Sequence, residues 1–152
     1  MQRLKLQLSS EVTLQIGISL QDNHGLDVSG VASAEWILRA AEAIEDKSGR
    51  ETVIIDVGDV FAITECFVIT SGRTSRQVKA IVEEVEVAIK EAGGPSPTRI
   101  EGNDEYKWVL MDYGEFLVHV FDSNERDYYQ LERLWSDRPL ATFPLDEATN
   151  LR

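Results

Sequence analysis

Two apolar, β-favouring runs make up Tyr106–Phe121, YKWVLMDYGEFLVHVF, the stretch that most constrains the fold of this chain. The runs are separated at Asp112–Gly114, which contains turn-forming residues. Two β-favouring runs joined by so short a connection predict an antiparallel hairpin with Gly114 in its turn. The rest of the chain then has to supply the sheet and the helices that support this hairpin.

The first strand of the predicted hairpin has one unusual face. Because successive side chains of a strand point to opposite sides, Trp108, Leu110 and Asp112 share a face, and Tyr113 falls on the other one. A core face seldom tolerates a carboxylate. Either Asp112 only serves the turn, or the face is a binding surface that is apolar with an acidic rim. Composition alone leaves both readings open.

Helical and strand patterns alternate before the hairpin. Apolar residues at helical spacing predict helices over Ala34–Lys47 and around Val78–Ile89. Continuous β-branched runs at Thr52–Val57 and Cys66–Thr70 predict two central strands that are buried on both faces. A short extended segment, Arg99–Gly102, leads into the hairpin.

A final helix is expected after the hairpin. Asp122 is a suitable N-cap, and Pro139 breaks the pattern. The apolar stripe of this helix would consist of Tyr128, Leu131, Leu134 and Trp135. The resulting order predicts an α/β fold with a mixed sheet of about five strands flanked by helices.

Three segments of the chain differ in pattern. Residues 1–30 read as an N-terminal extension, with alternation at 3–20 that suggests a small hairpin and a linker at Gln21–Gly30. Residues 31–138 hold the predicted domain, and residues 139–152 read as an extended or frayed C-terminal tail.

Composition narrows the function. A chain of 152 residues with 43% apolar content is long enough for one well-cored domain. The formal net charge of −12 disfavours direct nucleic-acid binding and suits a basic protein partner. The single cysteine, Cys66, excludes an internal disulfide, so a reducing, cytoplasmic location is expected. No apolar run is long enough to span a membrane.

The sequence offers little for catalysis. His119 lies within a predicted strand and reads as a hydrogen-bonded structural residue, and no Cys or His spacing suggests a metal or cofactor. The loop Ser71–Ser75 joins a strand to a helix, where phosphate loops occur, but it lacks the Walker lysine and the GxGxxG spacing. A tight turn followed by an N-cap at Thr74 or Ser75 explains it better.

Two long segments carry a family resemblance. ITECFVITSGRTSRQVKAIVEEVE and EGNDEYKWVLMDYGEFLVHVFDSNERDYYQLERLW resemble the ribosomal silencing factor family, also called Iojap-like proteins. The match covers about residues 33–138, and its most specific parts are Glu101–Phe121 and Arg126–Trp135.

This resemblance implies a translation repressor without catalysis. Such a factor docks on ribosomal protein L-fourteen of the large subunit and by its bulk prevents the small subunit from joining. The family fold is similar to a nucleotidyltransferase domain without catalytic residues. The matching positions for docking are Trp108, Leu110, Asp112 and Tyr113, with Glu115 and Tyr129 as weaker candidates.

Two further expectations accompany this interpretation. An exposed Trp and Tyr surface on the free protein would favour a homodimer. The competing function is a nucleotidyltransferase-type enzyme that uses the 71–75 loop, which would need paired carboxylates on a strand. Asp56 and Asp59 are the available pair, but only Asp56 falls within an apolar run, so docking is the favoured function.

Overall fold

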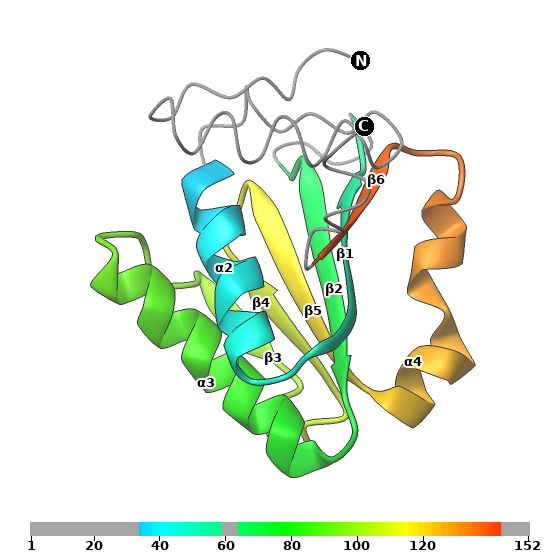
Figure 1. Ribbon diagram of the computed structural model, residues 1–152, viewed down its shortest axis with the longest axis horizontal. Coiled ribbons are helices and arrows are strands. Elements are labelled where there is room, and N and C mark those ends of the chain that lie inside the picture. The colour runs from blue at the N-terminus through cyan, green and yellow to red at the C-terminus, as the bar shows by residue number, and fades with distance from the viewer. Residues whose placement is uncertain (1–33, 59–63, 144–152) are drawn as a thin grey trace.

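The computed structural model describes residues 34–58 and 64–143, which form a six-stranded mixed sheet with helices on both faces (Figure 1). The strand order is β3-β4-β5-β2-β1-β6, and β2 and β5 form the parallel pair. The strands are β1 (Arg50–Asp56), β2 (Cys66–Gly72), β3 (Arg99–Glu101), β4 (Trp108–Asp112), β5 (Phe116–Asp122) and β6 (Leu140–Phe143). The helices are α2 (Ala34–Asp46), α3 (Ser75–Glu91), α4 (Ser123–Tyr129) and the 3-10 helix η1 (Leu131–Trp135).

The predicted hairpin is confirmed as β4 and β5. The two strands pair antiparallel, with Trp108 opposite Phe121 and Asp112 opposite Leu117. Gly114 lies in the turn with φ of +87°, a conformation that favours glycine. Exposure alternates along β4, so the predicted separation of its two faces is also confirmed.

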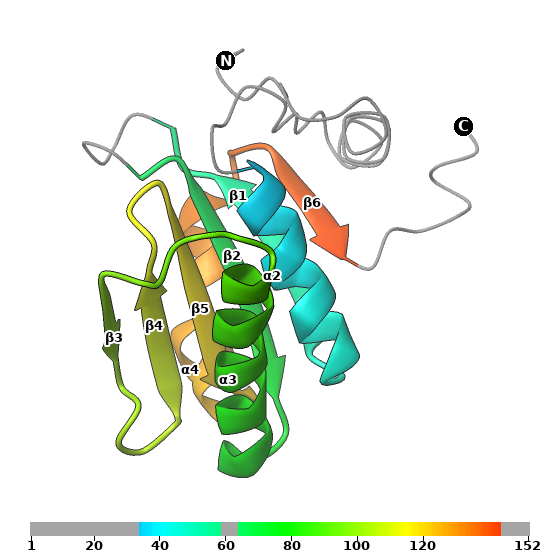
Figure 2. The ribbon, with the colours of Figure 1, turned by 90° about the vertical axis from the view of Figure 1, so that its left-hand side faces the viewer.

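One face of the sheet is covered by α2 and α3, which lie side by side in front of it in Figure 2. The apolar stripe of α3 packs into the core because its residues recur at helical spacing. Thr74 is the N-cap of this helix, and its side chain accepts a hydrogen bond from the Gln77 backbone N–H at 3.1 Å. We call this side the closed face; its fully buried residues include Ile37, Ile81, Val85, Met111, Phe116 and Val118.

The other face of the sheet is covered only in part, by α4 and η1, which lie behind the sheet in Figure 2. Leu131 and Trp135 of η1 pack against a cluster centred on Phe67, Ile69 and Phe121. The side chains on β4 are half-buried on this side. We call the uncovered part the open face; it consists of Arg99, Glu101, Trp108, Leu110, Asp112, Leu117 and His119, with Tyr129 at its border.

The prediction of one continuous helix after the hairpin is wrong, because this segment is divided into α4 and η1. Asp122 caps α4 as expected, accepting the Asn124 N–H at 2.9 Å, but Gln130 adopts a left-handed conformation with φ of +48°. The chain therefore turns before η1, which directs Leu131 and Trp135 toward the sheet. A single helical stripe does not form.

The sheet is larger than the sequence predicted. It has six strands rather than about five, because Leu140–Phe143 joins it as β6, although residues 139–152 were assigned to a tail. Ala141 pairs with Ile54 and is fully buried. This pairing satisfies backbone groups of β1 that would otherwise be buried without partners.

Some sequence expectations lie outside the described residues. The N-terminal extension 1–30 and Asp59 are among them. Within residues 34–58 and 64–143, no helix has the length and apolar character needed to cross a membrane.

Candidate functional site

Trp108 is the centre of the open face. Its ring stacks on Phe121 with 4.7 Å between centroids, and the Tyr129 ring lies 4.8 Å away on α4. The indole Nε1–H also donates a hydrogen bond to His119 Nδ1 at 3.1 Å. Trp108 is therefore held in one orientation while remaining half-buried. Large aromatic residues fixed in advance are typical anchors of protein interfaces, because little side-chain entropy is lost on binding.

His119 supports the tryptophan rather than offering a free base. Only 6% of its surface is exposed, and burial lowers its pKa to about 4. Because Nδ1 accepts the Trp108 N–H, the imidazole is neutral and carries its proton on Nε2. The predicted hydrogen-bonded structural histidine is confirmed.

Both carboxylate oxygens of Asp112 have partners within the protein. Its Oδ1 accepts the Gly114 backbone N–H at 2.8 Å, and its Oδ2 lies 3.4 Å from Arg99 Nε. Asp112 therefore takes part in the turn, and its role in binding is a separate question. The side chain is still 22% exposed on the open face, so its contact with a partner stays a prediction.

Arg99 links two carboxylates at the border of the open face. It lies between Asp112 and Glu101, with its Nη1 at 3.0 Å from Glu101 Oε2. Two acids share one guanidinium, so this border retains a net negative charge. No role of Arg99 or Glu101 was predicted from the sequence, although alternation along the short strand and its pairing with β4 place them together.

Tyr113 and Glu115 lie apart from the other predicted docking residues. Tyr113 is buried on the closed face, where its ring stacks on Phe116 at 4.8 Å. Burial, together with the nearby Glu86 charge, raises the pKa of its phenol. Glu115 is exposed in the hairpin turn. The structure thus brings together Trp108, Leu110, Asp112 and Tyr129 as one surface.

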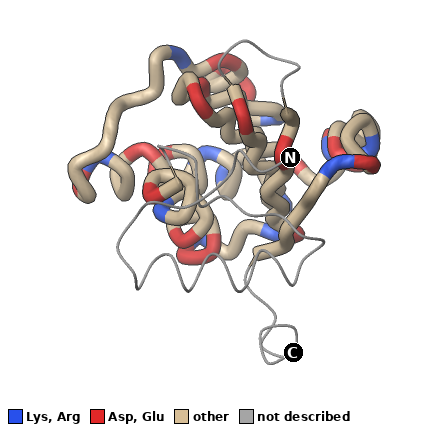
Figure 3. Tube along the Cα trace, turned by 90° about the horizontal axis from the view of Figure 1, so that it is seen from above, with Lys and Arg blue, Asp and Glu red and all other residues tan. Residues whose placement is uncertain are grey.

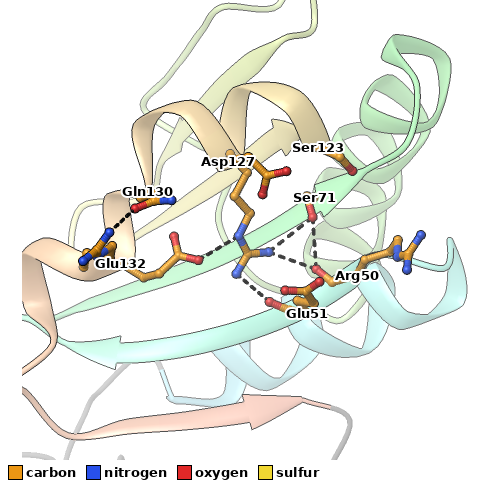
Figure 4. Close-up of a pocket in the computed structure, with 9 residues that line it drawn as sticks. Arg50, Glu51, Ser71, Ser123, Asp127, Gln130 and Glu132 are labelled. Atoms are coloured by element: carbon orange, nitrogen blue, oxygen red, sulfur yellow. Dashed lines mark hydrogen bonds and ion pairs between the residues drawn. The ribbon is translucent and has the colours of Figure 1, made fainter.

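Arg126 positions the elements that border this surface. Its guanidinium donates to the Arg50 carbonyl at 3.0 Å, to the Glu51 carbonyl at 2.7 Å and to Ser71 Oγ at 3.3 Å. It also pairs with Glu132 of η1 at 3.0 Å. Figure 4 shows these acceptors from β1, β2 and η1 around one pocket. Arg126 therefore joins α4 and η1 to the sheet, and Tyr129 follows it on the same helix.

The geometry gives the enzymatic alternative no support in the described residues. In the 71–75 loop, Thr74 caps α3, and the Arg73 backbone N–H donates to Gln77 Oε1 at 2.7 Å. Asp56 is buried, accepts the Gly58 N–H at 2.7 Å and lies 3.4 Å from Arg138. Residues 34–58 and 64–143 hold no cluster of three or more His, Cys, Asp or Glu residues suited to a metal ion.

Acidic residues outnumber basic ones, and they are spread widely over the fold. Figure 3 shows Asp and Glu positions on all sides of the fold, in line with the net charge of −12. Between Glu101 and Asp137, ten acids accompany three bases. A partner of the open face is thus met by a negative field.

These features define a class: an α/β domain in which one half-covered sheet face presents a fixed aromatic residue with acidic neighbours. Comparison with known proteins identifies the family. Residues 30–151 match the family described as "Ribosomal silencing factor during starvation", and the chain belongs to this family.

Individual relatives agree with this assignment. The chain is 40% identical over 102 residues to "Ribosomal silencing factor RsfS" of Bacillus subtilis, covering 67% of this chain and 86% of that protein. It is also 30% identical over 97 residues to mouse "Mitochondrial assembly of ribosomal large subunit protein 1", of which it covers 42%.

Solved structures share the fold. A crystal structure of a protein from Chromobacterium violaceum superposes with a TM-score of 0.64 at 36% identity, covering 67% of this chain and 84% of that one. A protein from Bacillus halodurans gives a TM-score of 0.61 at 34% identity, covering 70% and 96%. The predicted α/β fold class is confirmed.

Proposed function

We propose that this chain is a ribosomal silencing factor that binds ribosomal protein L-fourteen of the large subunit and blocks joining of the small subunit. The bound factor represses translation by steric exclusion of the small subunit, and no covalent chemistry is required. The observation that carries the proposal is Trp108, held half-buried on the open face by Phe121, Tyr129 and His119.

Several observations support a ribosomal protein as the partner. The relatives are named for ribosome silencing or, in mouse, for assembly of the large ribosomal subunit. Ribosomal proteins that contact RNA are basic, and the open face is bordered by Glu101 and Asp112. The contact surface that we propose consists of Trp108, Leu110, Asp112 and Tyr129, with Glu115 at its periphery; the buried Tyr113 supports the hairpin from behind.

The first test is co-sedimentation of the full chain with purified bacterial large subunits, followed by addition of small subunits. We expect Trp108→Ala to lower the affinity at least 30-fold and to restore subunit joining, because truncating a central aromatic residue of an interface costs about 2–4 kcal/mol. Trp36→Ala, which changes the same residue type beside the closed face, is the control. Wild-type binding by a folded Trp108→Ala protein would contradict the proposal.

Asp112 needs two variants because it also serves the turn. Asp112→Lys is expected to abolish binding, since reversing a charge that faces a basic partner costs at least about 2 kcal/mol. Asp112→Asn keeps an oxygen for the Gly114 N–H and removes the charge, together with the ion pair to Arg99. If both variants bind like wild type while circular dichroism shows them folded, Asp112 serves the turn alone.

The same surface is expected to self-associate in the free protein, because exposed aromatic patches of interface size are rarely left uncovered. Light scattering at micromolar concentration should show a homodimer that Trp108→Ala dissociates. A wild-type protein that is monomeric under these conditions would exclude this self-association.

A further inference from the structure

A small hollow lies beside Trp108 on the open face. It has a volume of about 290 Å³ and is lined by Glu101, Gly102, Trp108, Leu110 and His119. Ligand pockets for whole small molecules begin at roughly this size, so the hollow suits a single side chain better than a nucleotide.

Gly102 keeps the wall of this hollow free of side chains. Its φ is +86°, and a Cβ atom at this position would collide with the Trp108 carbonyl oxygen. Any other residue would therefore push β3 away from β4. The close approach of the two backbones brings Glu101 to the border of the hollow, opposite Leu110 in the strand register.

The lining is apolar on one side and anionic on the other. Trp108 and Leu110 form a half-buried apolar surface, while the Glu101 side chain is 55% exposed. Glu101 pairs with Arg99, but Arg99 is also within 3.4 Å of Asp112. Glu101 can therefore turn toward an incoming cation while Arg99 keeps a carboxylate partner.

We propose that this hollow receives one lysine or arginine side chain of the docking partner, with its aliphatic stem against Trp108 and Leu110 and its charged head on Glu101. Long basic side chains combine an apolar stem with a cationic end, which matches this lining. A phosphate or an acidic side chain would be repelled by Glu101, and a purely apolar side chain would add no new partner for that carboxylate.

This inference rests on the proposed function, because it assumes that the open face contacts a protein. It assigns to Glu101 the direct pairing with a partner cation. Asp112 is less accessible for this role, because its side chain is 22% exposed against 55% for Glu101 and also accepts the Gly114 N–H.

The test compares two glutamates that receive the same substitution. Affinity of the full chain for purified bacterial large subunits is measured for Glu101→Gln and Glu105→Gln, at low and at raised salt. Glu105 is the matched control, since its side chain is 69% exposed, pairs at 3.9 Å with Lys107 and does not line the hollow. We expect Glu101→Gln to bind about tenfold more weakly with a smaller dependence on salt, and Glu105→Gln to stay within about twofold of wild type.

Each outcome has one meaning. Equal losses in the two variants would indicate general charge attraction and overturn the proposal. Unchanged binding of Glu101→Gln, with a loss for Leu110→Ser, would mean that an apolar side chain occupies the hollow, which also overturns it. Trp108→Ala separates this failure from that of the proposed function: if Trp108→Ala loses binding while Glu101→Gln does not, only the basic side chain is excluded.

Discussion

The two faces of the sheet differ in the side chains that they carry and in how far these are buried. The closed face is packed by aliphatic residues of α2 and α3, and its central members, such as Ile81, Val85 and Val118, have no exposed surface. The open face leaves Trp108 half-buried and holds it by ring contacts with Phe121 and Tyr129 and a hydrogen bond to His119. Close packing of aliphatic groups contributes stability, whereas a rigid aromatic group with a polar tether keeps a surface ready for binding. We infer that stability and recognition are largely separated between the faces.

Neighbouring residues of β5 test this separation most strongly. Phe116 is 1% exposed on the closed face, and Leu117 is half-buried on the open face. Phe116→Ala should lower the free energy of unfolding by about 3–5 kcal/mol, since it leaves a cavity in a packed core. Leu117→Ala should lower it by only about 1 kcal/mol. Urea denaturation measures both, and similar losses would show that the faces do not differ as described.

Arg126 is expected to be an exception to this separation, because it joins α4 and η1, which border the open face, to the sheet. Arg126→Met removes four hydrogen bonds and leaves Glu132 without its cation, at an expected loss of about 3 kcal/mol in unfolding free energy. It should also weaken large-subunit binding by releasing Tyr129 from Trp108.

The control for Arg126 is Arg133→Met in η1. Arg133 lines the same pocket but is exposed and bonds only to Gln130 Oε1, at 2.6 Å, among the described side chains. It should change the unfolding free energy by less than about 0.5 kcal/mol. If Arg126→Met were as mild as this control, α4 and η1 would not depend on the buried guanidinium.

The free energy of unfolding is expected to depend on pH through His119. The folded-state pKa of about 4 lies below the ordinary value of 6.5, so the unfolded chain binds more protons between these values. Stability from this group is complete above pH 6.5 and is lost as the pH falls toward 4. Between pH 7.5 and 5.0 we expect a loss of about 2 kcal/mol. The measurement is urea denaturation at both pH values, with His119→Gln as reference. Parallel pH curves for the two proteins would exclude this contribution.

The elements that could be predicted from the sequence are those with a pattern that is local in the chain. The hairpin of β4 and β5 and the stripe of α3 were found because alternation and helical spacing extend over several residues. β6 was missed because four residues after Pro139 carry too short a pattern, and only pairing with the distant β1 makes them a strand. The break at Gln130 was missed because a non-glycine residue in the left-handed region leaves little signal.

The site was predicted to a similar extent. Alternation placed Trp108 and Leu110 on one face, and it also placed Tyr113 on the other, where the structure buries it. Arg126 and Glu101 lie in the two segments that carry the family resemblance, but no function was predicted for either residue. The contacts of Arg126 join residues far apart in the chain, and Glu101 reaches the hollow only through the pairing of β3 with β4, so neither position can be read from spacing alone.

The parallel pairing of β2 with β5 also affects how the chain acquires its fold. This pair sets Cys66 beside Phe116, whereas α3 and the β4–β5 hairpin form from residues close in sequence. Contacts between distant residues form late, because loop closure must come first. During synthesis β2 therefore leaves the ribosome long before its central partner, and its apolar strand stays without that neighbour until β5 has been made. The middle of the sheet, the most buried part of the finished protein, is the part most open to misassembly in the growing one.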